Sequence, residues 1–302
     1  MPSPTTHLLA IDWGTSSLRG AQLAPDGAVL QERAFERGIL TIRPGEFPVV
    51  FESCFGDWMA PGTLCLIAGM AGSQQGWLEA PYCPCPAGFA DIAARLVWVD
   101  HAGPGRIAIV PGLNTESDGI PDVMRGEETQ VFGALAQLGL LDALFVLPGT
   151  HSKWVTVKGS RIVQFSSWMT GEFYALLRWH SILARTLPLG ATPHDDAAFK
   201  QGVTRALRGE GLLHTAFGTR TLALFTRMEP PALASYLSGL VIGEELRGQQ
   251  LRAGSHVIVI GAPALAARYQ QALDLLGVTC RTLDENATWA GLRAIADTLA
   301  PV

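Results

Sequence analysis

The stretch that decides the fold is residues 11–19, which reads Ile-Asp-Trp-Gly-Thr-Ser-Ser-Leu-Arg. An apolar run ends at Trp13, a polar turn at 14–17 follows, and a second apolar run begins. A Pro-Asp-Gly turn at 25–27 then predicts a third strand at 28–35. The chain therefore opens as an antiparallel meander. We call its first bend, residues 14–17, the first tip; it carries one glycine and three hydroxyl side chains.

The same order of elements returns in the middle of the chain. Residues 144–147 show an apolar strand pattern, and residues 148–152, Pro-Gly-Thr-His-Ser, form a second polar bend, the second tip. Strand patterns at 153–157 and 161–168 follow, separated by a tight turn. Strand, polar tip, strand, turn and strand thus occur once in each half, although the two copies are not a sequence repeat.

Helices and further strands complete each half. Residues 128–138 carry apolar side chains near helical spacing, and Gly139 suits a helix end. At 302 residues the chain is longer than a single core usually supports. We therefore predict an α/β protein of two domains, residues 1–140 and 141–302. The other expected elements are strands at 63–68, 106–111, 256–260 and 278–283 and helices at 171–186, 195–208, 215–225, 231–251, 263–276 and 286–299.

Composition excludes several classes of protein. Hydrophobic residues make up 48% and charged residues 16%, as in a folded protein with large cores. No apolar run approaches the roughly 18 residues that span a bilayer, and no secretory signal pattern opens the chain, so we expect a cytoplasmic protein. A net charge of −5 without a dense Lys/Arg stripe argues against nucleic acid or membrane as partner. The close cysteine pair at 83–85 is spaced too tightly for a zinc knuckle.

The first tip has the chemistry of a phosphate-binding loop. Gly14 allows close backbone approach to a polyphosphate, and the hydroxyls of Thr15 and Ser16 can add hydrogen bonds. Asp12, at the end of the preceding strand, could hold Mg²⁺ directly or through water. The alternative is a hairpin turn whose polar residues satisfy only local backbone groups.

The second tip repeats this chemistry with an added cation. Gly149, Thr150 and Ser152 again lie between strands, His151 lines the bend, and Lys153 could neutralise a phosphate. The spacing is not that of a Walker A loop. The alternative is that Lys153 is a solvated strand residue. Two such tips, one in each half, suit a nucleoside triphosphate.

A third stretch indicates where the rest of the nucleotide lies. Residues 257–263, Val-Ile-Val-Ile-Gly-Ala-Pro, form a buried-looking strand that runs into Gly261 and Ala262 before a helix. The carboxyl end of such a strand suits a nucleotide base or sugar. A plain strand–helix turn is the alternative. With one glycine the stretch lacks a dinucleotide fingerprint, so it gives only slight support to a nicotinamide dehydrogenase.

The fourth stretch is residues 125–130, Arg-Gly-Glu-Glu-Thr-Gln, where a helix begins. Phosphoryl transfer to a hydroxyl benefits from a carboxylate that orients the hydroxyl and accepts its proton, and Glu127 and Glu128 both qualify. The helix dipole also favours acidic residues here, which is the structural alternative. Arg125 could bind a substrate carboxylate in bidentate fashion, or form a surface ion pair.

With these stretches in order, the chain resembles the 2-dehydro-3-deoxygalactonokinase family of the actin/hexokinase/Hsp70-like superfamily. The resemblance covers the chain nearly end to end, and its strings are specific together although each is weak alone. They lie at residues 11–19, 69–73, 124–130, 147–154, 169–172 and 261–263.

The resemblance implies two ribonuclease H-like, actin/hexokinase-type domains with mixed sheets and ATP in an interdomain cleft. It makes Asp12 to Ser16 the first phosphate segment, residues 149–153 the second, and Gly261 with Ala262 the adenosine segment. Related sugar kinases have an aspartate where this chain has glutamate. Glu128 matches the position best, and the choice between it and Glu127 stays open.

The resemblance also implies the reaction, which is transfer of the γ-phosphoryl group of ATP, with Mg²⁺, to the 6-hydroxyl of 2-dehydro-3-deoxy-D-galactonate in galactonate catabolism. Thr170 and Glu172 would lie near the substrate, or alternatively cap a helix. Three other functions stay open: a kinase for another sugar or sugar acid, an ATPase or phosphatase of the same superfamily, and a non-catalytic sugar- or nucleotide-binding protein. The sequence leaves the oligomeric state open, a homodimer included, and also the degree of domain closure.

Overall fold

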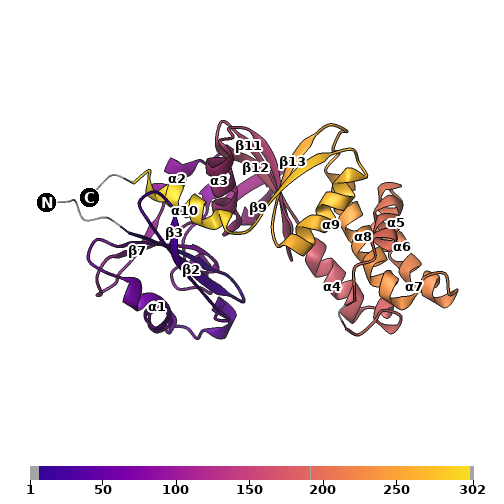
Figure 1. Cartoon of the computed structure of the whole chain (residues 1–302), viewed down its shortest axis with the longest axis horizontal. Helices are drawn as coiled ribbons and strands as arrows, with labels where there is room; N and C mark the ends of the chain where they lie inside the picture. The colour runs from indigo at the N-terminus through magenta and orange to yellow at the C-terminus, as the bar shows by residue number, and fades with distance from the viewer. Residues whose placement is uncertain (1–6, 191, 300–302) are drawn as a thin grey trace. The chain divides into compact units, whose positions relative to one another are not determined.

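The structure is a computed structural model that describes residues 7–190 and 192–299. The chain divides into two compact units (Figure 1). Unit 1 comprises residues 1–143, 155–166 and 285–302, and unit 2 comprises residues 144–154 and 167–284. The predicted boundary at residue 140 therefore lies close to one real crossing. It misses the two later segments that belong with unit 1.

Unit 1 contains a six-stranded mixed sheet in the order β3-β2-β1-β4-β7-β6. Strand β1 pairs antiparallel with β2 and parallel with β4, and β2 pairs antiparallel with β3, so the predicted opening meander is confirmed. The strands are β1 (Leu8–Trp13), β2 (Leu18–Leu23), β3 (Val29–Phe35), β4 (Leu64–Gly69), β6 (Val97–Val99) and β7 (Arg106–Ile109).

The core of unit 1 forms where the apolar faces of β1 and β4 meet an aromatic cluster. Trp13 is fully buried and packs against Phe47 at 5.4 Å and Trp77 at 6.1 Å between ring centroids. Phe47 belongs to helix α1 (Phe47–Phe55), which the sequence patterns did not predict. Three short 3-10 turns border this region: η1 (Ile39–Thr41), η2 (Gly56–Trp58) and η3 (Met70–Gly72).

A small second sheet leads the chain to the predicted catalytic helix. Its order is β5-β8-β9, with β5 (Cys83–Pro84), β8 (Leu113–Ser117) and β9 (Ile120–Met124). Strands β8 and β9 pair antiparallel as a hairpin that the sequence analysis did not predict, because its exposed and charged residues hide the alternation. Helix α3 (Glu127–Leu138) begins three residues after β9 and ends at Gly139, as predicted.

The last helix, α10 (Ala287–Ala296), belongs to unit 1 because it packs tightly on α3. Glycines permit this approach: a Cβ on Gly133 would lie 1.7 Å from the Ala287 carbonyl oxygen, and one on Gly291 would lie 1.9 Å from the Thr129 carbonyl oxygen. This packing is why the assignment of residues 285–302 to the second domain is wrong for the compact units. Helix α2 (Phe89–Ala93) completes unit 1.

Unit 2 is built on a five-stranded sheet in the order β12-β11-β10-β13-β14. Strand β13 pairs parallel with both β10 and β14. Both large sheets begin with their third, second, first and fourth strands in chain order, so the predicted recurrence of one plan is confirmed for these four strands. The strands are β10 (Ala143–Leu147), β11 (Ser152–Lys158), β12 (Arg161–Trp168), β13 (His256–Ile260) and β14 (Thr279–Leu283); the distal parts of β11 and β12 count with unit 1.

Helices make up the rest of unit 2, and α4 to α8 lie together at one end of it (Figure 1). Helices α5 and α8 touch through small residues: a Cβ on Gly202 would lie 2.1 Å from the Tyr236 carbonyl oxygen. The predicted helices at 171–186 and 215–225 each break, at Ser181 and Ala216. The helices are α4 (Thr170–His180), η4 (Ile182–Arg185), α5 (Asp196–Leu207), α6 (Leu212–Thr215), α7 (Phe217–Leu224), α8 (Pro230–Gly248) and α9 (Pro263–Asp274).

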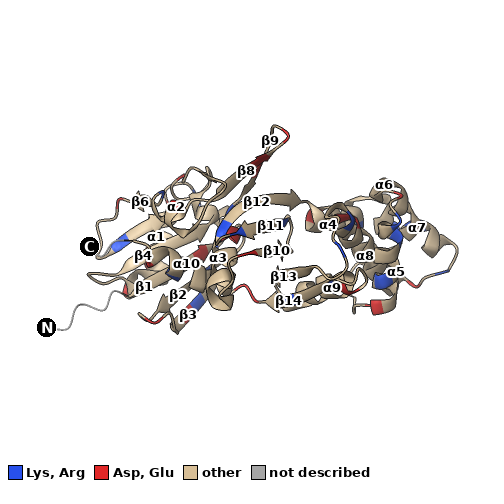
Figure 2. Ribbon diagram, turned by 90° about the horizontal axis from the view of Figure 1, so that it is seen from above, with Lys and Arg blue, Asp and Glu red and all other residues tan. Residues whose placement is uncertain are grey.

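The structure shows how charged and apolar residues are distributed along the chain. Figure 2 shows Lys and Arg interspersed with Asp and Glu along the described ribbon rather than gathered in one stripe. Within the described residues, no helix has the length and apolar character needed to cross a bilayer.

Candidate active site

The first tip is fixed by the segment that precedes η1. The Gly14 N–H donates to the Ser17 carbonyl at 2.9 Å, and the Gly14 carbonyl accepts from Ile39 N–H at 3.0 Å. Gly38 permits this contact, because a Cβ there would lie 2.2 Å from the Thr15 carbonyl oxygen. The side chains of Thr15 and Ser17 are exposed. The carbonyls of Gly14 and Thr15 are therefore used by the neighbouring segment, whereas the hydroxyl side chains of the tip remain at the surface, where a ligand can reach them.

Asp12 lies at the carboxyl end of β1, directly before the first tip. Its carboxylate is 20% exposed and accepts from the Arg19 guanidinium at 2.6 Å across the β1–β2 pair. Among the described residues no group of three or more metal-ligating side chains occurs. A cation at Asp12 would therefore depend on phosphate oxygens and water for most of its ligands, which is the usual arrangement for Mg²⁺.

Two glycines bring the start of α3 to the same edge of the sheet. Gly69, at the end of β4, has φ +89°, and a Cβ there would lie 2.8 Å from the Trp13 carbonyl oxygen and 3.2 Å from Asp12 Oδ1. Gly126 has φ +105°, and its Cβ would lie 3.3 Å from the Gly69 Cα. Side chains at either position would separate α3 from Asp12. The structure thus brings together Asp12 and the acidic helix start, which are more than a hundred residues apart.

Glu128 occupies an environment suited to proton transfer. Its side chain is fully buried, and Oε2 accepts from the Gly126 N–H at 2.7 Å. Oε1 is buried and has no hydrogen-bond partner among the described residues. Burial, followed by the negative charge of Glu127, raises the pKa of Glu128 from 4.5 to about 8. A buried, unsatisfied carboxylate oxygen is costly unless a ligand supplies the donor.

The two glutamates therefore differ. Glu127 is only partly buried and accepts from the backbone N–H of Arg125 at 3.0 Å. The Glu128 bond to Gly126 is also one that a capping carboxylate makes. Capping does not explain why Oε1 is buried without a partner. The geometry favours Glu128 as the group that meets a substrate hydroxyl.

Arg125 is held in the interior of unit 1. Its Nη2 donates to the Ala80 carbonyl at 2.8 Å, and its guanidinium carbon lies 4.4 Å from the centroid of the Tyr82 ring. Within residues 7–190 and 192–299, no hydrogen-bond partner is found for the buried Nε and Nη1. Gly72 makes room for them, since a Cβ there would lie 2.7 Å from Nη1. Because Cδ lies between Nε and Nη1, their N–H groups point in different directions and offer two separate donors rather than the parallel pair that binds a carboxylate in bidentate fashion.

The second tip packs against the start of α4. The Glu172 N–H donates to the Thr150 carbonyl at 3.0 Å, and His151 Nε2 lies 2.5 Å from Glu172 Oε2. Gly171 permits the contact, because its Cβ would lie 2.4 Å from the Gly149 carbonyl oxygen. Thr150 and His151 are exposed. Glu172, predicted near the sugar acid, therefore lies beside the second tip.

Three other predicted side chains point inward instead. The Ser152 hydroxyl is fully buried and donates to Glu245 at 2.8 Å, and the buried Thr170 hydroxyl also donates to Glu245. Both hydroxyl protons are therefore used by a buried carboxylate, and the predicted roles of Ser152 in phosphate binding and of Thr170 in substrate binding stay predictions. Lys153 is 6% exposed and its ammonium donates to Ser167, so the alternative of a solvated strand lysine is wrong.

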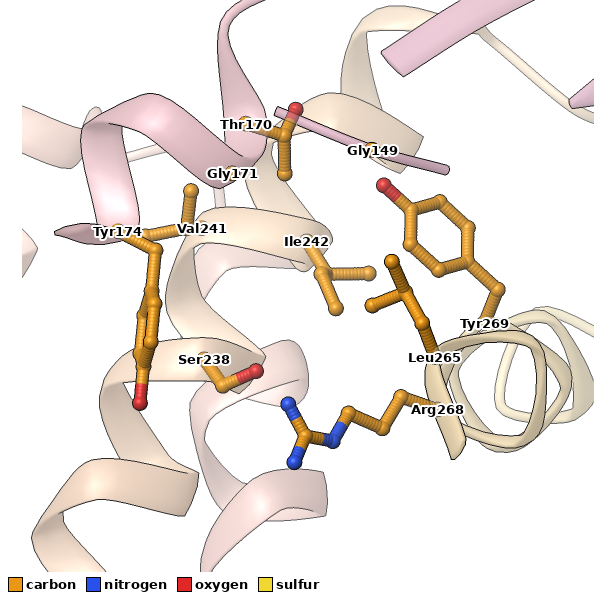
Figure 3. Close-up of a pocket in the computed structure, with 10 residues that line it drawn as sticks. All are labelled: Gly149, Thr170, Gly171, Tyr174, Ser238, Val241, Ile242, Leu265, Arg268 and Tyr269. Carbon is orange, nitrogen blue, oxygen red and sulfur yellow. The ribbon is translucent and has the colours of Figure 1, made fainter. Parts of the chain in front are cut away.

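A pocket in unit 2 opens directly beside the second tip (Figure 3). Gly149 and Gly171 form one side, and α9 contributes Leu265, Arg268 and Tyr269 from a single helix face. The remaining lining residues are Thr170, Tyr174, Ser238, Val241 and Ile242. The sequence analysis missed the α9 residues. Their helical spacing of three and four was visible, but nothing in the sequence showed that this face borders a pocket.

The predicted adenosine segment leads into the same region. Gly261 and Ala262 join β13 to α9, and a Cβ on Gly261 would lie 3.6 Å from Pro148 Cδ at the second tip. The end of β13, the second tip and the pocket are therefore contiguous within unit 2. An adenine and a phosphate chain could be bound there by one continuous surface, at the carboxyl ends of parallel strands.

Comparisons with known proteins show the family of the chain. A family model described as 2-keto-3-deoxy-galactonokinase matches residues 12–295. The chain is 38% identical over 302 residues to "Probable 2-dehydro-3-deoxygalactonokinase DgoK1" of Rhizobium meliloti (strain 1021), covering 98% of each chain. It is 36% identical over 299 residues to the 2-dehydro-3-deoxygalactonokinase of Escherichia coli (strain K12), covering 98% of this chain and 99% of that protein.

Solved structures establish the fold. A crystal structure of a candidate 2-dehydro-3-deoxygalactonokinase from Sinorhizobium meliloti superposes with a TM-score of 0.89 at 36% identity, covering 98% of this chain and all of the other. Component A of the Acidaminococcus fermentans (R)-2-hydroxyglutaryl-CoA dehydratase matches at a TM-score of 0.50 and 10% identity, over 97% and 96% of the two chains, and shows a shared fold only. The predicted actin/hexokinase type of α/β fold is confirmed. By its sequence and by its structure, the chain belongs to the 2-keto-3-deoxy-galactonokinase family.

Proposed function

We propose that the protein is an ATP-dependent kinase that phosphorylates the 6-hydroxyl of 2-dehydro-3-deoxy-D-galactonate, giving the 6-phosphate and ADP. Family membership supports the reaction class. The observation that carries the proposal is Glu128, whose buried oxygen without a partner and pKa of about 8 suit it to receive a hydroxyl proton near neutral pH.

ATP is assigned to both tips and to the pocket of unit 2. The base and ribose would bind near Gly261 and Ala262, against the α9 face of Leu265, Arg268 and Tyr269 that lines the pocket. Gly149 and the exposed Thr150 and His151 would receive phosphate oxygens at the second tip. The first tip would receive them at Gly14, Thr15 and Ser16. Lys153 keeps a supporting electrostatic role through its buried positive charge close to the second tip.

Mg²⁺ fits Asp12, whose carboxylate is partly exposed at a strand end next to the first tip. When bound, Mg²⁺ would neutralise negative charge on the phosphates. Arg19 orients the Asp12 carboxylate from one side, through its bond of 2.6 Å to Oδ2. Asp12 then presents its remaining oxygen on the side of Gly69, where α3 begins.

In the proposed reaction Arg125 binds the sugar-acid carboxylate, and Glu128 accepts a hydrogen bond from the 6-hydroxyl. As the hydroxyl oxygen forms its bond to the γ-phosphorus, the proton moves to Glu128 and the bond between that phosphorus and the β-phosphate oxygen breaks. ADP leaves and the sugar 6-phosphate remains. The proton on Glu128 then returns to solvent. Exclusion of water from the buried Glu128 would protect ATP against hydrolysis.

The test is a coupled assay for ADP, with the purified protein, ATP, Mg²⁺ and several 2-keto-3-deoxy sugar acids. We expect ADP release to require a sugar acid and to be fastest per unit concentration with the galactonate form. ADP release without a sugar acid would indicate an ATPase. A higher kcat/KM for another acid would indicate a kinase for that acid. Nucleotide binding without turnover would indicate a non-catalytic binding protein.

A further inference from the structure

Unit 2 contains a buried carboxylate that the proposed reaction does not use. Glu245 lies in α8 and is 1% exposed. Its Oε1 accepts from Ser152 Oγ at 2.8 Å and from Trp154 Nε1 at 2.7 Å. Its Oε2 accepts from Tyr269 Oη at 2.6 Å and from Thr170 Oγ1. Four donors from three other elements therefore converge on a single side chain.

The chemistry of these donors favours an acceptor with two equivalent oxygens. An indole N–H can only donate, so Trp154 always needs an oxygen. Three hydroxyls donate beside it, and a carboxylate can accept all four bonds at once. Burial raises the pKa of Glu245, whereas each of the four hydrogen bonds lowers it. A fully satisfied polar network of this kind fixes the elements that it joins.

The elements joined by Glu245 are those that form the proposed nucleotide site. Ser152 directly follows the exposed part of the second tip and begins β11. Thr170 begins α4, and the next residue, Gly171, packs on the Gly149 carbonyl. Tyr269 comes from α9. Thr170 and Tyr269 also line the pocket, and their hydroxyls face the Gly149 side of it (Figure 3).

We infer that Glu245 is a positioning residue for nucleotide binding, which holds the second tip, the start of α4 and the α9 wall of the pocket in one arrangement without touching the nucleotide. This inference rests on the proposed assignment of ATP to unit 2. It adds to that assignment a residue, Glu245, that would affect nucleotide affinity without contacting the nucleotide. It also predicts that a substitution of Glu245 weakens binding of the nucleotide more than binding of the sugar acid. The proposed contacts of the sugar acid, Arg125 and Glu128, lie in unit 1.

Glu245→Gln is the diagnostic variant, because glutamine keeps the size and one oxygen. That oxygen can still accept from Ser152 and Trp154. The amide nitrogen then faces the hydroxyls of Tyr269 and Thr170, which must turn to accept instead of donate. Tyr269→Phe and Thr170→Val each remove one hydroxyl from the same oxygen with little change of shape. Glu244→Gln is the matched control, since Glu244 precedes Glu245 on α8 but pairs with the exposed Arg247.

The experiment measures the Kd for ATP and ADP by calorimetry, and KM for both substrates, for all variants in the full chain. We expect Glu245→Gln to weaken nucleotide binding by roughly tenfold or more, the scale of a disrupted charge-assisted network. Tyr269→Phe and Thr170→Val should also weaken nucleotide binding, but by a smaller factor. The sugar-acid KM should stay within about twofold, and Glu244→Gln should match the wild type on every measure.

Unchanged nucleotide affinity in a folded Glu245→Gln protein would overturn the inference. So would an equal loss for both substrates, which would show a merely structural role. If Glu245→Gln does not fold, unchanged nucleotide affinity in both hydroxyl variants overturns it. Wild-type protein that binds ATP but transfers no phosphoryl group would refute the proposed function while the Kd values still decide the inference. Wild-type protein that binds no nucleotide would refute both.

Discussion

Gly126 approaches Gly69 so closely that a Cβ on Gly126 would lie 3.3 Å from the Gly69 Cα. Gly69 ends β4, and Gly126 directly precedes α3. Both have positive φ values, which L-residues other than glycine rarely adopt. This glycine contact sets how near Glu128 can come to Asp12. The geometry of the candidate active site therefore depends on the absence of two side chains.

Replacement of Gly69 by alanine should damage catalysis. The new Cβ would lie 2.8 Å from the Trp13 carbonyl oxygen, so β1 and β4 must separate beside Asp12. Gly62→Ala is the control, because Gly62 has φ +87° and no atom within 4 Å of the added Cβ. Both variants should lose about 1–3 kcal/mol of unfolding free energy from backbone strain. Only Gly69→Ala should lower kcat/KM, by about tenfold or more. Equal kinetics in the two variants would contradict this assignment.

Replacement of Glu128 by glutamine should remove the proton acceptor and keep the shape of the side chain. We expect kcat to fall by about 10²–10⁴-fold, the range for loss of a general base, while ATP still binds. Glu127→Gln should cost less, because Glu127 is partly exposed and bonds to the Arg125 backbone. Single-turnover phosphoryl transfer measures both variants. Near-normal turnover of the Glu128 variant would exclude that residue from the role.

The pH profile should report the pKa of Glu128. A general base must be ionised, so kcat/KM should rise with pH and reach half of its maximum at about 8, the pKa that burial and Glu127 confer. In Glu127→Gln the neighbouring negative charge is gone, so the same rise should occur at lower pH. Steady-state kinetics between pH 5.5 and 9.5 (roughly) would follow it. A rise that does not move in the Glu127 variant would show that another group titrates.

Stability should depend on pH in the opposite sense. Folding raises the pKa of Glu128 from 4.5 to about 8, so between these values the folded protein holds a proton that the unfolded chain has lost. The Glu128 contribution to the unfolding free energy therefore falls as pH rises through this window. Glu128→Gln should be more stable than the wild type by up to ~5 kcal/mol at pH 8, and the difference should vanish near pH 4.5. Urea unfolding at several pH values measures it; a constant difference would contradict the raised pKa.

Replacement of Arg125 by lysine should weaken binding of the sugar acid. Lysine keeps the charge but has one ammonium group in place of the separate N–H donors at Nε and Nη1. We expect KM for the sugar acid to rise roughly tenfold and KM for ATP to change little. Arg106→Lys is the control, because Arg106 also stacks on an aromatic ring, Trp98 at 3.8 Å, but is exposed. A larger change in the ATP KM than in the sugar-acid KM would refute the role.

Local sequence was enough to predict both tips and the helix that carries Glu128. Each tip stands between two apolar strands and contains glycine and hydroxyl residues, so the pattern is complete within about fifteen residues. The hairpin of β8 and β9 could not be predicted in this way, because exposed residues dominate its strands. The break of the predicted helix at Ser181 has a local cause instead, because the Ser181 side chain accepts from the Leu183 N–H at 3.1 Å and so caps η4.

Local sequence also failed to predict the partners of two residues within the site, Ser152 and Thr170. Ser152 and Thr170 resemble surface phosphate and substrate contacts in the sequence, where hydroxyls follow glycine or a strand end. Their hydroxyls point instead to Glu245, about ninety and seventy-five positions away along the chain. A hydroxyl serves whichever partner is near it, and nothing in a local pattern identifies a distant carboxylate on another helix.

The sequence by itself determined the strand–tip–strand plan of both halves, the acidic helix start after Arg125, and the family. These features depend on periodicity, turn residues and short strings, which are encoded by neighbouring residues. Only the tertiary structure decided that α10 joins unit 1, that Gly126 contacts Gly69, and that Glu245 is buried beneath the second tip. Burial and close packing depend on residues far apart in the chain, and the pKa of Glu128 follows from that burial.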